Sequence, residues 1–471
     1  MNRRKFIRAT TSALIYMVCG STSEGKDDTH KDAKPNILFI MTDQQNAGMM
    51  SCTGNKWLKT PAMDSLAREG IRFEIAYCAN PVCVPSRTSM ATGVMPGRLG
   101  VFDNSSGMKK AAIPDEVDKN SLGRIIRRAG YDTFYGGKVH MCSALDPSNA
   151  GYDKYFSDRR DKLPGACIKF MKKKRDKPFF AVASFINPHD ICFVYSAYKG
   201  KGKHNMASVD KLYQQALSLP LYQLPPLPEN YAIPEDEPEA IEAHLSPKAV
   251  TPAITMRQKY NEREWRIYRW IYCRLTEQVD KQIGRILDGL KKAGLEEKTL
   301  VVFTSDHGNM DGCHRLSSKG LFYEESVRVP LIMMYKGVIP RKKDKEHLVS
   351  TGLDILPTLC DYADIKTPAH LLGKSLRRIA EGKTVNEWRS YVASENGWCR
   401  MIRSKRFKYC IYDSGENREF LVDLENDPGE MRNITNDLRY KKALDEQRQF
   451  LKEWIQISDD TAGSKYLRLT S

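Results

Sequence analysis

The sequence of 471 residues contains 12 cysteines but lacks the paired C-x-x-C spacing of structural zinc sites. It also lacks internal repeats, and its basic clusters come without the aromatic platforms or zinc-finger spacing of nucleic-acid-binding proteins. Beyond a short apolar run near the amino terminus, no segment is long and apolar enough to span a membrane. These absences exclude a fold that is held together by structural zinc sites, and they exclude a repeat protein. We expect neither a nucleic-acid partner nor a transmembrane segment.

What the sequence does contain is a soluble, globular balance of residues. Hydrophobic residues make up 41% of the chain and charged residues 28%, which provides enough apolar material for a sizeable core. The chain is longer than a single small hydrophobic core usually supports. We therefore expect one large α/β domain with an appendage, or several small domains. With 74 Lys and Arg against 58 Asp and Glu, the net charge of +16 attracts anions, including sulfated or phosphorylated substrates.

Residues 1–33 are predicted to be an export signal and a disordered tether. A basic start leads into a short apolar run at 13–18, and the pair Arg3-Arg4 followed by Phe6 resembles a twin-arginine leader. Cys19 is a candidate for the lipidated first residue of an exported protein. We therefore expect export to a bacterial periplasm, with a lipid-anchored or a secreted protein as the alternatives.

Short apolar runs that end in polar residues recur along the chain. They cover 36–41, 179–185 and 299–303, and such continuous runs are typical of central parallel strands buried on both faces. The ligand-capable residues that follow them are Asp43, Gln44, His189, Asp306 and His307. Open α/β sheets place their active sites at the carboxyl ends of such strands, so we expect these side chains to meet at one edge.

Helical segments are predicted between the strands, at 61–69, 121–129 and 262–293. Alternating strands and helices favour a doubly wound, mostly parallel sheet with flanking helices. We assign this α/β fold to a catalytic domain at 34–375. Within it, the Pro-rich stretch 194–250 is predicted to be a long loop that borders the active face.

The pattern changes after residue 375. Short alternating segments separated by turn-forming residues predict a small antiparallel sheet, and a closing helix is predicted at 438–457. We therefore expect a smaller C-terminal α+β subdomain at 376–471.

The segment Cys83-Val-Pro-Ser-Arg87 carries the most specific signal in the chain. A cysteine and an arginine four positions apart lie on one face of a helix, and the helix N-terminus adds its own partial positive charge. Both features favour an anion at this place. From the spacing alone, a buried cysteine beside a surface arginine explains the pattern equally well.

This segment is similar to the signature of the formylglycine-dependent sulfatases, which belong to the alkaline phosphatase-like superfamily. The resemblance extends from Lys34 to about Asn433, because further motifs recur in family order. These motifs are Pro35–Gln44, Gly137–His140, Asn187–His189, Ser305–Gly308 and Lys319–Glu324. The resemblance implies a sulfuric ester hydrolase.

In this family the signature directs oxidation of its cysteine, so the resemblance implies that a maturation enzyme converts Cys83 to formylglycine (3-oxoalanine). One hydroxyl of the hydrated aldehyde attacks sulfur, and deprotonation of the other expels sulfate by breaking the C–O bond. The resemblance also implies a divalent cation, whose candidate ligands are Asp43, Gln44, Cys83, Asp306 and His307. The family usually holds Ca²⁺. Because Gln44 and His307 stand where many relatives carry Asp and Asn, Mg²⁺ and Mn²⁺ stay open.

The remaining family positions supply charge and proton transfer. By resemblance, Arg87, Lys138 and Lys319 stabilise the sulfate. His140 holds the hydrated aldehyde and His189 protonates the departing alkoxide, although the two histidines can exchange these roles. Less specific candidates for substrate binding, each equally compatible with a structural role, are His314, Asn104 and Arg400.

The leading hypothesis is an exported hydrolase that removes sulfate from a carbohydrate, with glycosaminoglycan or other sulfated glycan fragments as substrates. Choline sulfatases and phosphonate or phosphate ester hydrolases of the same superfamily resemble the chain as well. A third hypothesis is a catalytically silent binder of sulfated glycans. The retention of Cys83, Pro85 and Arg87 together argues against it.

Overall fold

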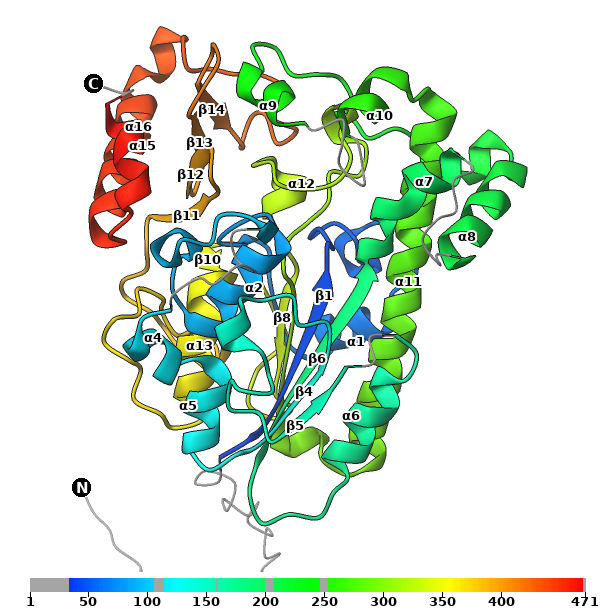
Figure 1. The fold of residues 1–471 in the computed structure, drawn as a ribbon, viewed down its shortest axis with the longest axis vertical. Coiled ribbons are helices and arrows are strands. Elements are labelled where there is room, and N and C mark those ends of the chain that lie inside the picture. The colour runs from blue at the N-terminus through cyan, green and yellow to red at the C-terminus, as the bar shows by residue number, and fades with distance from the viewer. Residues whose placement is uncertain (1–33, 106–112, 158–159, 200–206, 246–252, 469–471) are drawn as a thin grey trace, which may run out of the picture. The chain divides into compact units, whose positions relative to one another are not determined.

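The computed structural model describes residues 34–105, 113–157, 160–199, 207–245 and 253–468, and the predicted leader lies outside them. Among these residues, eight strands form one mixed, mostly parallel sheet in the order β5-β4-β6-β1-β7-β8-β2-β9 (Figure 1). Their bounds are β1 Asn36–Asp43, β2 Ile71–Phe73, β4 Asp132–Gly137, β5 Lys154–Phe156, β6 Phe179–Pro188, β7 Thr299–Ser305, β8 Leu331–Met334 and β9 Lys342–Asp344. Strand β8 is antiparallel to its neighbours β7 and β2. A separate parallel pair joins β3 (Ala76–Tyr77) to β10 (Val349–Ser350).

Strand β1 is buried on both faces, which explains why its sequence is continuously apolar. Ile37, Phe39 and Met41 pack into a core on one face of the sheet, and Leu38 and Ile40 pack into a second core on the other. The first face is covered by α2 (Cys83–Thr92), α5 (Leu122–Arg128), α13 (Thr351–Tyr362) and α14 (Arg377–Ala380). The second face is covered by α1 (Pro61–Glu69), α6 (Leu163–Met171) and α11 (Glu262–Lys292). Helices on both faces confirm the predicted doubly wound α/β architecture.

The helices predicted between the strands are confirmed within a residue or two. Helix α1 matches the prediction, α5 is preceded by a short α4 (Asp115–Lys119), and α11 begins with a capping box between Asn261 and Glu264. The prediction of a long loop over 194–250 is wrong, because this stretch contains α7 (Val194–Tyr198), α8 (Ala207–Ser218) and α9 (Glu239–His244), followed by α10 (Ala253–Lys259). Within the described residues, no helix combines the length and the hydrophobicity needed to cross a bilayer.

The C-terminal part adds an antiparallel sheet, as predicted. Its described strands pair in the order β11 (Tyr391–Glu395), β12 (Cys399–Ser404), β13 (Phe407–Tyr412) and β14 (Glu419–Asp423). Helix α15 (Lys441–Ile457), followed by the short α16 (Ser464–Leu467), packs Leu451 and Trp454 against one face. Side chains of the other face share a core with Tyr323 and with Val327 of α12 (Glu324–Val327), in the connection from β7 to β8. This sheet therefore covers the segment that carries Lys319. The domain boundary at 375 stays a prediction.

Candidate active site

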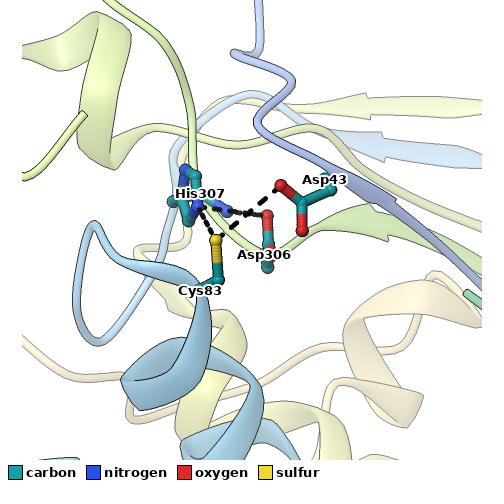
Figure 2. A group of neighbouring side chains, drawn as sticks. All are labelled: Asp43, Cys83, Asp306 and His307. Carbon is teal, nitrogen blue, oxygen red and sulfur yellow. Dashed lines mark hydrogen bonds and ion pairs between the residues drawn. The ribbon is translucent and has the colours of Figure 1, made fainter. Parts of the chain in front are cut away.

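The site lies where two neighbouring strands and one helix meet. Strands β1 and β7 pair in parallel with Thr42 opposite Ser305, so the chain leaves both strands at the same edge of the sheet. Helix α2 begins at this edge with its first residue toward the strand ends (Figure 2). One ligand atom from each of four fully buried residues lies within 4.8 Å of the others, and these residues are Asp43, Cys83, Asp306 and His307.

The thiol of Cys83 is surrounded by nitrogen atoms. Its Sγ lies 2.9 Å from Lys319 Nζ, 3.1 Å from His307 Nε2 and 3.9 Å from Lys138 Nζ. Because His307 Nδ1 donates to the carbonyl oxygen of Gly308 at 2.9 Å, Nε2 is the ring nitrogen that faces Cys83 Sγ. Burial by itself raises the pKa of a thiol, but the cations of Lys138 and Lys319 outweigh it, and the pKa of Cys83 is held well below its ordinary value.

Arg87, one turn into α2, is buried beneath the carboxylates. Its Nη2 donates to Asp43 Oδ2 at 2.8 Å and its Nε donates to Asp306 Oδ2 at 2.7 Å. Nη1 donates to Ser184 Oγ at 2.8 Å and to the carbonyl oxygen of Lys138 at 3.0 Å. The guanidinium thus clamps the two carboxylates, and the structure does not place it at an open position facing a sulfate.

Gln44 lies at the same strand end, in a left-handed conformation with φ of 67°. Its backbone N–H donates to Asp306 Oδ1 at 3.0 Å, and its side-chain Nε2 donates to Asn309 Oδ1 at 2.9 Å. Its Oε1 accepts a hydrogen bond from Cys192 Sγ at 3.3 Å. Neither Asn309 nor Cys192 was predicted as a site residue. The available signal was their position within three residues of the strand-end residues His307 and His189.

Lys138 and His189 come from two further strand ends. Lys138 follows β4, and its Nζ lies 2.6 Å from Asp43 Oδ2. His189 follows β6 with part of its surface exposed, and burial together with the cations of Lys138 and Lys319 holds the pKa of His189 well below its ordinary value. His140 has φ of 44° and a buried Nδ1 without a hydrogen-bond partner among the described residues. The structure therefore brings Lys138 and His189 to the four-residue group and leaves the contact of His140 a prediction.

Asn104 and Arg400, both less specific candidates, have different surroundings. Asn104 Oδ1 accepts a hydrogen bond from the backbone N–H of Val84 at 3.1 Å, so Asn104 supports the first turn of α2 beside Cys83. Arg400 is buried, and its Nε and Nη2 donate to the carboxylate of Asp460 at 2.5 and 3.0 Å. Asn104 thus contacts helix α2, which carries Cys83, whereas Arg400 forms a buried ion pair with Asp460.

His314 lies in a second cluster, apart from Cys83. It is fully buried, and a ligand atom of its ring lies within 4.8 Å of carboxylate oxygens of Glu325 and Glu430. The ammonium of Lys408 contacts Glu430 and so already compensates one of these carboxylates. Burial lowers the pKa of His314 to about 4, so the ring is neutral. His314 belongs to the packing between the β7–β8 connection and the C-terminal sheet.

The four-residue group fits a divalent cation. It offers carboxylate oxygens from Asp43 and Asp306 and the imidazole Nε2 of His307, the ring nitrogen that faces inward. The side-chain oxygen of Gln44 belongs to the same strand end. Oxygen donors suit Ca²⁺, Mg²⁺ and Mn²⁺, and one imidazole among them is compatible with all three. The donor atoms lie close enough together to share one ion.

A candidate cation site at the carboxyl edge of a mostly parallel α/β sheet, with a nucleophile-capable residue at a helix N-terminus beside it, is the arrangement of the alkaline phosphatase-like hydrolases. A family model described as "Sulfatase" matches residues 35–365, and a model described as "N-sulphoglucosamine sulphohydrolase, C-terminal" matches residues 312–456. The chain belongs to the sulfatase family. Its reaction is the hydrolysis of a sulfate ester.

The similarity to individual relatives covers nearly the whole chain. The chain is 31% identical to a Δ4,5-hexuronate-2-O-sulfatase of Bacteroides thetaiotaomicron, over 94% of this chain and 92% of the relative. It is 26% identical to an N-acetylglucosamine-6-O-sulfatase of the same organism, over 94% of this chain and 89% of that protein. Among solved structures, a 2-O GAG sulfatase aligns with a TM-score of 0.79 at 28% identity, over 92% of this chain and 94% of the other.

Proposed function

We propose that this sulfatase acts on carbohydrates, with fragments of glycosaminoglycans or other sulfated glycans as substrates. The sulfate part of the proposal is carried by one observation: the ammonium of Lys319 lies 2.9 Å from Cys83 Sγ, within a buried group of two carboxylates and a histidine. The carbohydrate part is supported by the two relatives that act on hexuronate and N-acetylglucosamine sulfates. The net charge of +16 adds a long-range attraction for an acidic oligosaccharide.

Cys83 is the precursor of the nucleophile in this proposal. It is the first residue of the ten-residue helix α2, where the helix N-terminus favours a neighbouring anion. A formylglycine-generating enzyme is the partner that oxidises the thiol to an aldehyde. The hydrated aldehyde supplies one hydroxyl to form the bond to sulfur and a second whose deprotonation later releases sulfate.

Asp43, Gln44, Asp306 and His307, together with the side chain at position 83, hold the divalent cation, with Ca²⁺ as the first candidate and Mg²⁺ or Mn²⁺ as the alternatives. When bound, the cation neutralises charge on the sulfate and favours the deprotonated nucleophile. Arg87 contributes by fixing the two carboxylates from below, through contacts of 2.8 and 2.7 Å. Its effect on catalysis therefore passes through the carboxylates.

The other charged residues divide between the sulfate and the leaving group. Lys138 and Lys319, which flank Cys83 Sγ, bind sulfate oxygens and stabilise the charge that builds up in the transition state. The negative charge of a bound sulfate ester opposes the effect of the two lysine cations on the pKa of His189, and the protonated ring donates a proton to the bridging oxygen while the S–O bond breaks and its electron pair moves onto that oxygen. A sugar alkoxide is a poor leaving group, so this proton matters most for a carbohydrate substrate. His140 remains the candidate for holding the hydrated aldehyde.

We also propose that the protein is exported, with a periplasmic location as the first choice. The support is the leader-like sequence of residues 1–33, with its Arg3-Arg4 pair and apolar run. A lipid anchor at Cys19 is the alternative to removal of the whole leader. Fractionation of the producing cells, with the mass of the mature amino terminus, tests both versions.

A substrate panel tests the proposed activity. The enzyme, produced together with a formylglycine-generating enzyme, is given mono- and disaccharides sulfated at defined positions, with choline sulfate and a phosphonate monoester as further members. We expect sulfate release from at least one sulfated sugar at a higher kcat/KM than from either non-sugar compound. Preference for choline sulfate or the phosphonate would contradict the carbohydrate assignment and favour the corresponding alternative.

A further inference from the structure

The residue after Lys319 is held from two sides. Gly320 N donates to the carbonyl oxygen of Pro81 at 3.0 Å, two residues before Cys83. On the other side, Asn396 Nδ2 donates to the carbonyl oxygen of Gly320 at 3.0 Å. Asn396 lies in the turn between β11 and β12, so a residue of the C-terminal sheet contacts the backbone that carries the catalytic lysine.

The surroundings of Asn396 fix the orientation of its amide. Asn396 is only 2% exposed, and its Oδ1 accepts hydrogen bonds from Trp398 N at 3.0 Å and Cys399 N at 2.9 Å. Arg400 Nη1 donates to the backbone oxygen of Asn396 at 2.6 Å. Because the amide oxygen is occupied by two backbone donors, the amide nitrogen is directed to Gly320.

The neighbouring residue ties the same turn to the segment of the nucleophile. Glu395 N donates to the carbonyl oxygen of Ala79 at 2.9 Å, four residues before Cys83. Glu395 Oε1 accepts a hydrogen bond from Gly97 N at 2.6 Å, in the segment that follows α2. The end of β11 and the turn that follows it therefore contact the chain before α2, the chain after α2 and the chain after Lys319.

We propose that Asn396 is a positioning residue, which sets the place of the Lys319 ammonium relative to position 83 by fixing the peptide bond that follows Gly320. The inference rests on the proposed function, because it requires Lys319 to bind the sulfate. Lysine has a long and flexible side chain, so the place of its charge depends on where its backbone is anchored. A displacement of about 1 Å in a catalytic group can cost up to about 10²-fold in rate.

Asn396→Asp isolates this single hydrogen bond. The aspartate keeps an oxygen for Trp398 N and Cys399 N, but it replaces the donor to Gly320 with a second oxygen. We expect kcat/KM to fall roughly 10-fold or more for 4-nitrophenyl sulfate and for a sugar sulfate alike. The inhibition constant of inorganic sulfate should rise by a similar factor. Asn396→Ser, whose hydroxyl is too short to reach Gly320, should behave in the same way if the aspartate variant does not fold.

Asn433, which is hydrogen-bonded to β14 of the same sheet, provides a matched control. Its Oδ1 accepts hydrogen bonds from Leu421 N at 3.2 Å and Thr435 N at 3.1 Å, and its Nδ2 donates to the carbonyl oxygen of Glu419 at 2.9 Å. Leu421 and Glu419 lie in β14, and Thr435 lies in the turn that follows Asn433. Asn433→Asp therefore makes the same chemical change in an amide that also accepts from two backbone N–H groups and donates to a carbonyl oxygen. We expect it to lower thermal stability as Asn396→Asp does, without changing the inhibition by sulfate.

A double-mutant cycle with Lys319→Ala tests whether Asn396 acts through Lys319. The formylglycine content of each variant is measured by mass spectrometry. If Asn396 acts through Lys319, Asn396→Asp should cause no further loss in the Lys319→Ala background. An equal loss in both backgrounds, or wild-type kinetics and sulfate inhibition in Asn396→Asp, would overturn the positioning role. If Lys319→Ala itself keeps the wild-type rate, the proposed sulfate contact is wrong and the role of Asn396 with it. An impaired Lys319→Ala beside an unimpaired Asn396→Asp refutes only the role of Asn396.

Discussion

Lys319 Nζ lies 2.9 Å from Cys83 Sγ, although the two residues are 236 positions apart in the chain. Burial by itself lowers the pKa of a lysine, but the negative charges of Cys83 and Asp43 outweigh it, and the pKa of Lys319 is raised above its ordinary value. The side chain is therefore a cation beside the residue that becomes the nucleophile. This relationship links the β7–β8 connection, which carries the lysine, to helix α2.

Replacing the nucleophile precursor should separate catalysis from folding. We expect Cys83→Ala to abolish sulfate release, because no aldehyde can form, and to leave the thermal unfolding transition within a few degrees of the wild type. Cys83→Ser should also be inactive in a host whose maturation enzyme accepts only cysteine. Steady-state kinetics with 4-nitrophenyl sulfate and calorimetry of each variant provide the measurements. Near-wild-type turnover of either variant would refute the covalent mechanism.

Chelation should remove activity reversibly, and Ca²⁺ should restore it at least as well as Mg²⁺. We expect Asp306→Asn to weaken metal binding by about 10²-fold or more, and Gln44→Ala to weaken it much less, because a carboxylate neutralises the ion and an amide does not. Asparagine is preferred to alanine at 306, since it keeps an acceptor for the buried Arg87. Isothermal titration calorimetry of the metal-free proteins measures both effects. Full activity without metal would exclude the proposed site.

The leaving-group side can be tested by changing the leaving group. His189→Ala should slow hydrolysis of a sugar sulfate by roughly 10²–10⁴-fold, the usual effect of removing a positioned general acid. 4-Nitrophenyl sulfate, whose leaving group needs little protonation, should be affected far less. Lys319→Ala is the control, because it removes a charge that contacts the sulfate itself and should slow both substrates by about 10²-fold. Equal losses on both substrates in His189→Ala would move the acid role to another residue, with His140 tested first.

The buried Glu395 predicts a pH dependence of stability. Burial, together with the negative charge of Asp460, raises the pKa of Glu395 from an ordinary value of 4.5 to about 7. The guanidinium of Arg400 opposes this shift, but its Nε lies closer to Asp460, at 2.5 Å, than to Glu395, at 3.5 Å. The folded state therefore binds a proton more tightly than the unfolded state, and the contribution of Glu395 to stability falls as the pH rises from about 4.5 to about 7.

Glu395→Gln keeps a hydrogen-bond acceptor for Gly97 N and removes the titration. We expect its free energy of unfolding, relative to the wild type, to increase across this pH window by at most about 3 kcal/mol and to level off above it. Urea unfolding of both proteins at several pH values gives the difference. A constant difference at all pH values would show that the pKa of Glu395 is the same in the folded and unfolded protein and would contradict the raised pKa.

Sequence patterns were sufficient for the strands and for the residues at their ends. The apolar run before Asp43 indicated a strand covered on both faces, and cores on both sides of β1 confirm it. Parallel pairing then places Asp43 and Asp306 at one edge without any further information. The alternating segments near the carboxyl terminus indicated the antiparallel sheet, although the structure covers both of its faces.

Polar partners that are far apart in the chain could not be predicted from sequence patterns. Arg400 was a candidate for contacting the substrate, but its partner Asp460 lies 60 positions further along the chain and no spacing rule connects them. Arg87 was expected to bind sulfate, yet its donors are directed to the two carboxylates by the way α2 meets the strand ends. The helices within 194–250 were missed because the prolines there masked the short periodic segments between them.

The most direct test of the account is the relation between aldehyde content and turnover. The fraction of Cys83 converted to the aldehyde is measured by mass spectrometry of its peptide, in preparations made with increasing amounts of the maturation enzyme. Sulfate release from the best sugar substrate is measured on the same preparations. We expect kcat to rise in proportion to the converted fraction and to vanish when none is converted. Full sulfate release by protein in which Cys83 remains a thiol would contradict the account.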